Sequence, residues 1–182
     1  MIAMAAGCLL PIGTACTGDN YSIYARRLAY LRVSPVNTAA PLFSALNNPG
    51  QWCAVTYDAT HYRFASPTAT ASLPRTALDA YGLPRSIAGM LIGTPSLPEV
   101  DGSHQPRAYD LACPSCYESA YIERALQLSA TTPDQAHCAR CGRDYNLATG
   151  TPLNAPDRQV QAPLYRYRLQ YGAAQGVLIV QN

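Results

Sequence analysis

The chain has 182 residues, of which 48% are apolar and 13% are charged, so it can bury the core of one folded domain. Its net charge of +2 and the scatter of its basic residues exclude the electrostatic signature of a nucleic-acid-binding protein. All 13 cationic side chains are arginine, which excludes Schiff-base chemistry and a phosphate-loop lysine. The 13 tyrosines, 15 prolines and 12 glycines favour short strands separated by turns, and therefore an all-β fold.

The N-terminal segment, residues 1–15, carries no charge and resembles the apolar part of an export signal, although it lacks the usual basic start. Its end, Gly-Thr-Ala-Cys16, is similar to the lipobox of bacterial lipoproteins, in which the cysteine is lipidated and becomes the new N-terminus. We therefore expect a lipid anchor at Cys16, with Cys8 as a second candidate. This would place the protein on a membrane of the bacterial cell envelope, periplasmic or at the surface. The alternative is a buried N-terminal strand with incidental cysteines.

The first half of the remaining chain predicts short strands and loops. Residues 23–33 mix aromatic and aliphatic residues with arginine and predict a strand, although helical periodicity is also present. Ser34-Pro35 would end this strand, because proline cannot donate a hydrogen bond to a sheet. The next elements predicted are a helical turn at 42–46, a strand at 52–57, and a loop over 58–86 with a short strand at 62–64.

The second half predicts a sheet that closes with a hairpin. An apolar run predicts a buried strand at 87–93, residues 95–105 a loop, and residues 107–111 a strand. Residues 121–128 fit either a strand or a helix. The alternation over residues 164–171, the glycine-bounded turn and the apolar run 177–180 predict an antiparallel C-terminal hairpin.

Four cysteines form two matched pairs, Cys113-Pro-Ser-Cys116 and Cys138-Ala-Arg-Cys141, with 21 residues between the pairs. Two such turns can direct four sulfur atoms at one tetrahedral ion, which is the usual structural zinc site. Their backbone amides would offset the charge of roughly −2 on a zinc ion with four thiolates. Gly142 follows the second pair and suits the positive φ that such a turn often needs. We therefore expect one metal ion, zinc in the first instance.

The sequence leaves three other interpretations of these cysteines open. Four thiolates also suit a rubredoxin-like single iron or a 2Fe-2S cluster, which would make the protein an electron carrier. Two local disulfides are expected if the chain is an extracellular interaction module in an oxidising compartment. The Cys-Pro-Ser-Cys motif also resembles a thioredoxin-type redox site, which requires a helix starting at the motif within a βαβ unit.

The residues around the second pair resemble the second cluster-binding box of the Rieske fold. Residues 138–150, Cys-Ala-Arg-Cys-Gly-Arg-Asp-Tyr-Asn-Leu-Ala-Thr-Gly, are similar to a Cys-x-x-His-Gly box with its aromatic residue, short strand and Thr-Gly turn. Residues 108–114 resemble the strand into the first box, usually Cys-Pro-His, and the resemblance is best over 87–180. It implies one antiparallel Rieske-like β domain over 16–182, with a rubredoxin-like or zinc-ribbon-like metal-binding lobe at about 108–150.

The chain departs from the Rieske pattern at both histidine positions. Cys113 and Cys138 match the cysteines of the family, but Ser115 and Cys141 stand where its histidines bind the second iron. The raised reduction potential of a Rieske centre needs those imidazoles. The resemblance therefore implies a non-enzymatic protein in which one structural metal replaces the two-iron cluster. The sequence identifies no protein partner.

The remaining chemically active side chains are expected to have structural roles. Cys53 lies in a predicted strand and is expected to be a buried apolar thiol. The three histidines are expected at the solvent-exposed surface, at His61, His104 and His137. The acids near the cysteine pairs are expected to form a solvated rim, at Asp110, Glu118, Glu123, Asp134 and Asp144.

Overall fold

A computed structural model gives the fold of the protein and describes residues 23–77, 79, 82–154 and 162–182. The predicted signal-like segment 1–15 and the predicted lipid-anchor residue Cys16 lie outside the described residues, as does Cys8. Within the described part of the chain, no helix is long and apolar enough to cross a membrane.

The elements in chain order are β1 (Tyr30–Val33), η1 (Val36–Thr38), α1 (Ala40–Asn47), β2 (Gln51–Tyr57), β3 (His61–Ala65), β4 (Thr70–Pro74), β5 (Met90–Thr94), β6 (Arg107–Asp110), α2 (Pro114–Ala120), β7 (Gln127–Leu128), β8 (Gln135–His137), β9 (Asp144–Asn146), β10 (Arg166–Gly172) and β11 (Val177–Gln181).

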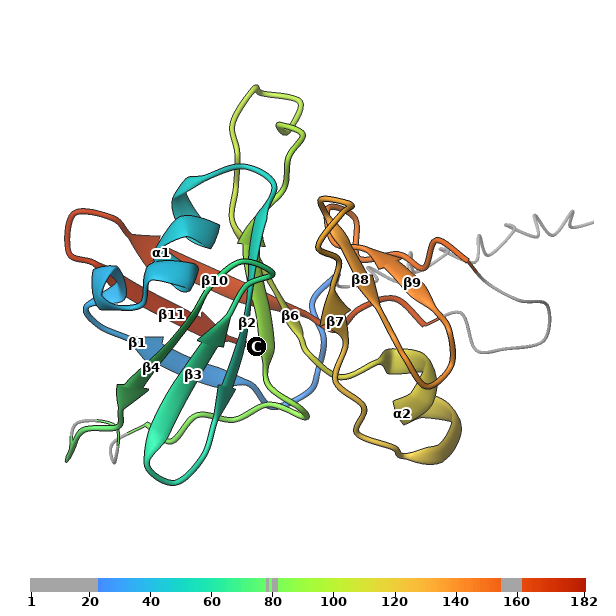
Figure 1. The fold of residues 1–182 in the computed structure, drawn as a ribbon, viewed down its shortest axis with the longest axis horizontal. Coiled ribbons are helices and arrows are strands. Elements are labelled where there is room, and N and C mark those ends of the chain that lie inside the picture. Colours follow the sequence, from blue (N-terminus) through green and yellow to red (C-terminus); the bar gives the residue numbers. More distant parts are fainter. Residues whose placement is uncertain (1–22, 78, 80–81, 155–161) are drawn as a thin grey trace, which may run out of the picture.

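Eight strands form a curled sheet in the order β1-β11-β10-β6-β5-β2-β3-β4, and every neighbouring pair is antiparallel (Figure 1). A smaller sheet, β7-β8-β9, lies beside it together with α2. We call residues 111–154 the cysteine lobe. The lobe leaves the large sheet after β6, and the chain returns through β10, the strand that pairs with β6. The all-β expectation is confirmed.

The central strands of the large sheet are buried on both faces, because successive side chains of a strand point to opposite sides. Met90 and Ile92 of β5 belong to the core under α1, whereas Leu91 between them belongs to the core under the cysteine lobe. Trp52 of β2 and Tyr109 of β6 join Leu91 on the lobe side and stack with ring centroids 6.1 Å apart. This double burial accounts for the continuous apolar run that predicts a buried strand in this segment.

The loop predicted over residues 58–86 is wrong in part, because it contains the β3–β4 hairpin. The short strand expected at 62–64 is present within β3, but β4 was not expected. Its sequence, Thr-Ala-Ser-Leu-Pro, lacks an apolar run because β4 is an edge strand that packs only one face against the core. Ala71 and Leu73 pack on the core, whereas Thr70, Ser72 and Pro74 are exposed.

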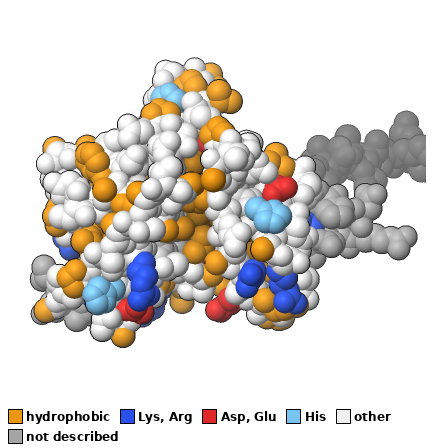
Figure 2. Space-filling view, in the orientation of Figure 1, with side chains coloured by type: hydrophobic (Ala, Val, Ile, Leu, Met, Phe, Trp, Pro, Cys, Tyr) orange, Lys and Arg blue, Asp and Glu red, His pale blue; other side chains and the backbone are white. Residues whose placement is uncertain are grey.

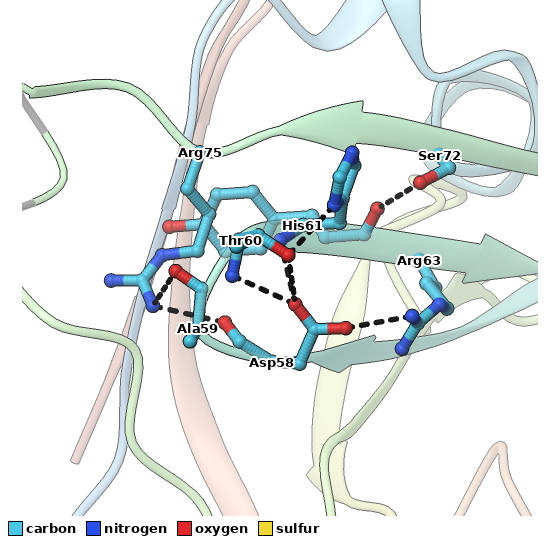
Figure 3. Close-up of polar contacts among 8 residues, drawn as sticks. Asp58, Ala59, Thr60, His61, Arg63, Ser72 and Arg75 are labelled. Carbon is cyan, nitrogen blue, oxygen red and sulfur yellow. Dashed lines mark hydrogen bonds and ion pairs between the residues drawn. The ribbon is translucent and has the colours of Figure 1, made fainter.

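The preceding turn, between β2 and β3, is fixed by a single carboxylate (Figure 3). Asp58 Oδ1 accepts the backbone N–H of Thr60 and of His61, each at 2.8 Å, and Asp58 Oδ2 pairs with Arg63 at 2.7 Å. Arg75 Nη1 donates to the Asp58 carbonyl oxygen at 3.0 Å and ties the end of β4 to the turn. The N–H donors of Thr60 and His61 hold the pKa of Asp58 well below its ordinary value.

Other element boundaries also differ from the sequence prediction. The strand expected over 23–33 is reduced to β1, and its first part makes only an isolated bridge, between Tyr24 and Arg166. The segment 121–128 contributes the two-residue strand β7 and an isolated bridge between Ala125 and Ala112. The C-terminal hairpin is confirmed as β10 and β11, in a register that pairs Arg168 with Gln181 and Gly172 with Val177.

Candidate metal centre

The four predicted ligand sulfurs come together in the cysteine lobe, where all four Sγ atoms lie within 4.8 Å of one another. Cys113 Sγ is 3.6 Å from Cys141 Sγ, and Cys116 Sγ is 3.7 Å from Cys138 Sγ. A tetrahedral zinc ion at about 2.3 Å from each sulfur requires sulfur–sulfur distances of about 3.8 Å. The cluster therefore has the dimensions of a four-thiolate metal site.

The first Cys-x-x-Cys turn, which we call the first knuckle, joins β6 to α2. Cys113 is the N-cap residue of α2, and Pro114 occupies the first turn of the helix, where no backbone N–H is needed. The helical turn aims the backbone N–H of Cys116 at the thiol of Cys113. The knuckle is tied to the following segment because Cys113 N donates to Arg124 O at 2.7 Å.

The second knuckle lies in the tight turn between β8 and β9. The turn is closed by Cys138 N donating to Arg143 O at 2.8 Å and by Gly142 N donating to Cys138 O at 2.9 Å. The backbone N–H groups of Arg140 and Cys141 point at the thiol of Cys138. Gly142 has φ +69°, so the positive φ expected for this glycine is confirmed.

The two knuckles differ in the pKa values of their thiols. Burial raises the pKa of Cys113 to about 11, against the opposing effects of the N–H of Cys116 and the hydroxyl of Tyr145. Burial also raises the pKa of Cys116. For Cys138, burial again opposes ionisation, but the N–H groups of Cys141 and Arg140 outweigh it and lower the pKa to about 7. A cation at the centre would stabilise all four thiolates together, beyond what the backbone N–H groups aimed at Cys113 and Cys138 supply.

A tyrosine from β9 completes the surroundings of the sulfurs. Tyr145 is fully buried, and its hydroxyl lies 3.6 Å from Cys113 Sγ. The backbone N–H of Ser115 points at the same hydroxyl oxygen, which leaves the tyrosine proton free to face the sulfur. The sequence does not predict this contact, although Tyr145 is the first aromatic residue after the second cysteine pair.

The expectation of a solvated acidic rim is wrong for Asp110, which is fully buried at the base of the cysteine lobe. Its carboxylate accepts the N–H of Ile87 and of Ala112, each at 2.7 Å, and the N–H of Ala88 at 3.2 Å. The hydroxyl of Tyr167 donates to it at 3.0 Å. Asp110 therefore joins the loop before β5, strand β10 and the chain just before the first knuckle.

A second carboxylate links the far end of the lobe to the large sheet. Asp134 Oδ1 accepts Trp52 Nε1–H at 2.7 Å, and Asp134 Oδ2 accepts the backbone N–H of Ser96 at 2.9 Å. Asp144 also has a specific partner, because it pairs with His137 Nδ1 at 2.8 Å on the adjacent strand. These acids hold the lobe together or fix it to the sheet, and none belongs to the sulfur cluster.

The remaining residues singled out from the sequence lie away from the sulfurs. Cys53 is fully buried in the core under α1, as expected, and burial raises its pKa to about 12. His61 and His104 are exposed, as predicted, and His137 is half-buried. Arg143 next to the second knuckle is fully buried, whereas Arg140 is exposed.

The helix that a thioredoxin-type site would need is present, because α2 begins directly after Cys113. The frame around it is not a βαβ unit, since β6 and its neighbours are antiparallel and the next strand, β7, belongs to another sheet.

The chain matches no protein-family model, and a search among curated proteins finds no similar sequence. The four-cysteine cluster is accordingly the feature on which a function can be argued.

Proposed function

We propose that this protein is a non-enzymatic lipoprotein of the bacterial envelope whose Rieske-like domain binds one structural zinc ion through Cys113, Cys116, Cys138 and Cys141. The observation that carries the proposal is the position of the four sulfurs on two opposed knuckles, at the spacing of a tetrahedral ion. The backbone N–H groups aimed at Cys113 and Cys138 add the charge compensation that such a site needs.

A structural role follows from the closed donor set. Four cysteine ligands fill a tetrahedral zinc ion and leave no position for water or substrate, whereas catalytic zinc sites keep one position open. Three of the four cysteines are also buried, namely Cys113, Cys116 and Cys138. A substrate would therefore meet neither an open coordination position nor an accessible nucleophile at these three residues.

The cysteine lobe has reason to depend on such an ion. Its strands have only two or three residues each, so its sheet supplies few hydrogen bonds. Cys113, Cys116 and Cys138 are themselves part of its buried core, beside a few larger side chains such as Tyr145 and Leu147. Metal binding then supplies free energy that a small apolar core does not.

The stability of the lobe tests this proposal. We expect Cys138→Ser to abolish stoichiometric zinc binding and to lower the melting temperature by well over about 5 °C, because losing one ligand forfeits much of the metal-binding free energy. Cys53→Ser is the matched control, since Cys53 is equally buried but lies in the other core. The control should retain one zinc per chain, and unchanged melting in Cys138→Ser would sink the structural-metal role.

Iron is a second candidate because one ligand is accessible. Cys141 is partly exposed, and a partly exposed thiolate is a route by which an electron could reach an external partner. Protein that carries iron absorbs in the visible, whereas the zinc form is colourless. Protein produced with both metals available would therefore separate the structural from the electron-transfer function by its spectrum.

The lipid anchor is tested independently of the metal. In a bacterial host that processes lipoproteins, the chain should sediment with membranes, and Cys16→Ser should move it to the soluble fraction. Cys8→Ser is the control that distinguishes the two candidate cysteines. Soluble behaviour of the unaltered chain would refute the envelope anchor and leave the metal site untouched.

A further inference from the structure

The four cysteines of the cluster differ in how solvent reaches them. Cys113 and Cys138 are fully buried and Cys116 is 4% exposed, whereas Cys141 is partly exposed at the end of the second knuckle. A small oxidant from solvent therefore reaches Cys141 before the three buried cysteines. Reaction at a thiolate follows accessibility and thiolate character, and a bound metal keeps all four sulfurs as thiolates.

Two short sulfur–sulfur contacts of the cluster run between the knuckles. Cys141 Sγ lies 3.6 Å from Cys113 Sγ on the first knuckle, and Cys138 Sγ lies 3.7 Å from Cys116 Sγ. Each cysteine therefore has a partner on the opposite knuckle within reach of a small displacement. Cys141, the cysteine that is oxidised first, therefore has the sulfur of Cys113 next to its own.

We propose that the cluster is a redox-convertible cross-link, in which the thiolate of Cys141 reacts first with a hydroperoxide and the site closes as two disulfides between the knuckles, Cys113–Cys141 and then Cys116–Cys138. The metal is released in the process. The inference deepens the proposed function, since it takes the metal-bound cluster as its starting state. It assigns Cys141 as the site of oxidation and a hydroperoxide as the class of oxidant.

The chemistry balances with hydrogen peroxide as the co-reactant. The Cys141 thiolate attacks one peroxide oxygen, the O–O bond breaks, and Cys141 becomes a sulfenic acid while hydroxide leaves. The thiolate of Cys113 then attacks the Cys141 sulfur, the S–S bond forms, and a second hydroxide leaves. Two protons convert the hydroxides to water, and the two sulfurs have supplied the two electrons that reduce the peroxide. A second peroxide oxidises Cys116 and Cys138 in the same way.

Disulfides between the knuckles would preserve the architecture that the metal maintains. The Cys113–Cys141 bond would join positions 28 residues apart, and the Cys116–Cys138 bond positions 22 residues apart. Both bonds would hold the end of β6 and α2 against the β8–β9 turn, as the metal does. Disulfides within each Cys-x-x-Cys turn would instead leave the two knuckles unconnected. The inter-knuckle pairing thus lets the lobe stay closed in either redox state.

The arginines of the chain make the pairing directly measurable. Tryptic cleavage places Cys113 and Cys116 in peptide 108–124, Cys138 in peptide 125–140 and Cys141 in peptide 141–143. The zinc-loaded full chain is treated with one equivalent of hydrogen peroxide, alkylated and digested, while a chromophoric chelator records zinc release. We expect zinc release together with a disulfide joining peptides 108–124 and 141–143.

A second equivalent of peroxide should attach peptide 125–140 to the same complex and leave the intact chain lighter by about 4 Da, since each disulfide removes two hydrogens. Fragmentation of the linked peptides assigns Cys113 to the first bond. A first bond joining peptides 125–140 and 141–143, or one closed within 108–124, would overturn the proposal. Oxidation of Cys141 to sulfinic acid without any disulfide would overturn it as well.

Two controls separate this inference from the proposed function. Cys53→Ser should give the same peptide map, because Cys53 is fully buried in the other core. Zinc content is measured before oxidation. A chain that binds zinc but forms disulfides within each knuckle refutes the inference alone. A chain that never binds zinc but forms the inter-knuckle disulfides refutes the structural-metal function and retains the pairing.

Discussion

Replacing Asp110 by alanine should destabilise the protein more than any surface substitution, because four donors converge on this one buried carboxylate. The donors are three backbone N–H groups at 2.7, 2.7 and 3.2 Å and the hydroxyl of Tyr167 at 3.0 Å. Each buried donor left without an acceptor costs about 1 kcal/mol or more. The alanine variant no longer buries a charged carboxylate, and the free energy saved in this way offsets part of the sum. We therefore expect the free energy of unfolding to fall by about 3 kcal/mol.

Two milder variants grade the same effect. Asp110→Asn keeps one oxygen acceptor and should lose less than the alanine variant, whereas Tyr167→Phe removes one donor only and should lose about 1 kcal/mol. The assay is urea unfolding at a fixed excess of free zinc, because metal binding to the native state adds to the measured stability. A loss below about 1 kcal/mol in Asp110→Ala would refute the idea that this carboxylate fixes the lobe to the sheet.

Four further substitutions probe the second knuckle, its tyrosine and the β2–β3 hairpin, with Gly102→Ala as the control for Gly142→Ala. Gly142→Ala and Gly102→Ala both place a side chain at positive φ with open space around it, so each should cost about 1 kcal/mol, but only the former should weaken zinc binding in a competition titration. Tyr145→Phe removes the hydroxyl beside Cys113 and should weaken zinc binding roughly fivefold in that titration, and unchanged affinity would exclude an O–H···S contribution. Asp58→Asn should lower the melting temperature at pH 7, because a depressed pKa contributes stability above the ordinary value of 3.8. This difference should shrink as the pH falls through the depressed folded value, and a difference that grew in acid would contradict the assigned sign.

The sequence was most informative where local chemistry dictates structure. The paired cysteines, the glycine after the second pair and the alternating C-terminal hairpin all specify geometry over a few residues, and the structure has each of them. Cys53 is another such case, since an apolar thiol in an alternating strand has little reason to be exposed.

The features that the sequence did not predict depend on tertiary context. Strand β4 has only Leu73 as a large apolar residue, and its pairing with β3 at the sheet edge makes it a strand. Asp110 is indistinguishable in sequence from a surface acid, because its donors come from segments 22 to 57 residues away as well as from the adjacent chain. Helix α2 is short and is stabilised by its place in the first knuckle rather than by helix propensity.

The most direct test of the central claim is to measure which metal the protein contains and which atoms coordinate it. The full chain, produced with zinc and iron both supplied and purified without chelators, should contain one zinc ion per molecule and show no visible absorption. X-ray absorption at the zinc edge should then find four sulfur neighbours at about 2.3 Å. Purified protein with reduced cysteines and no stoichiometric metal, or a zinc ion bound to nitrogen or oxygen instead of these four sulfurs, would contradict the account.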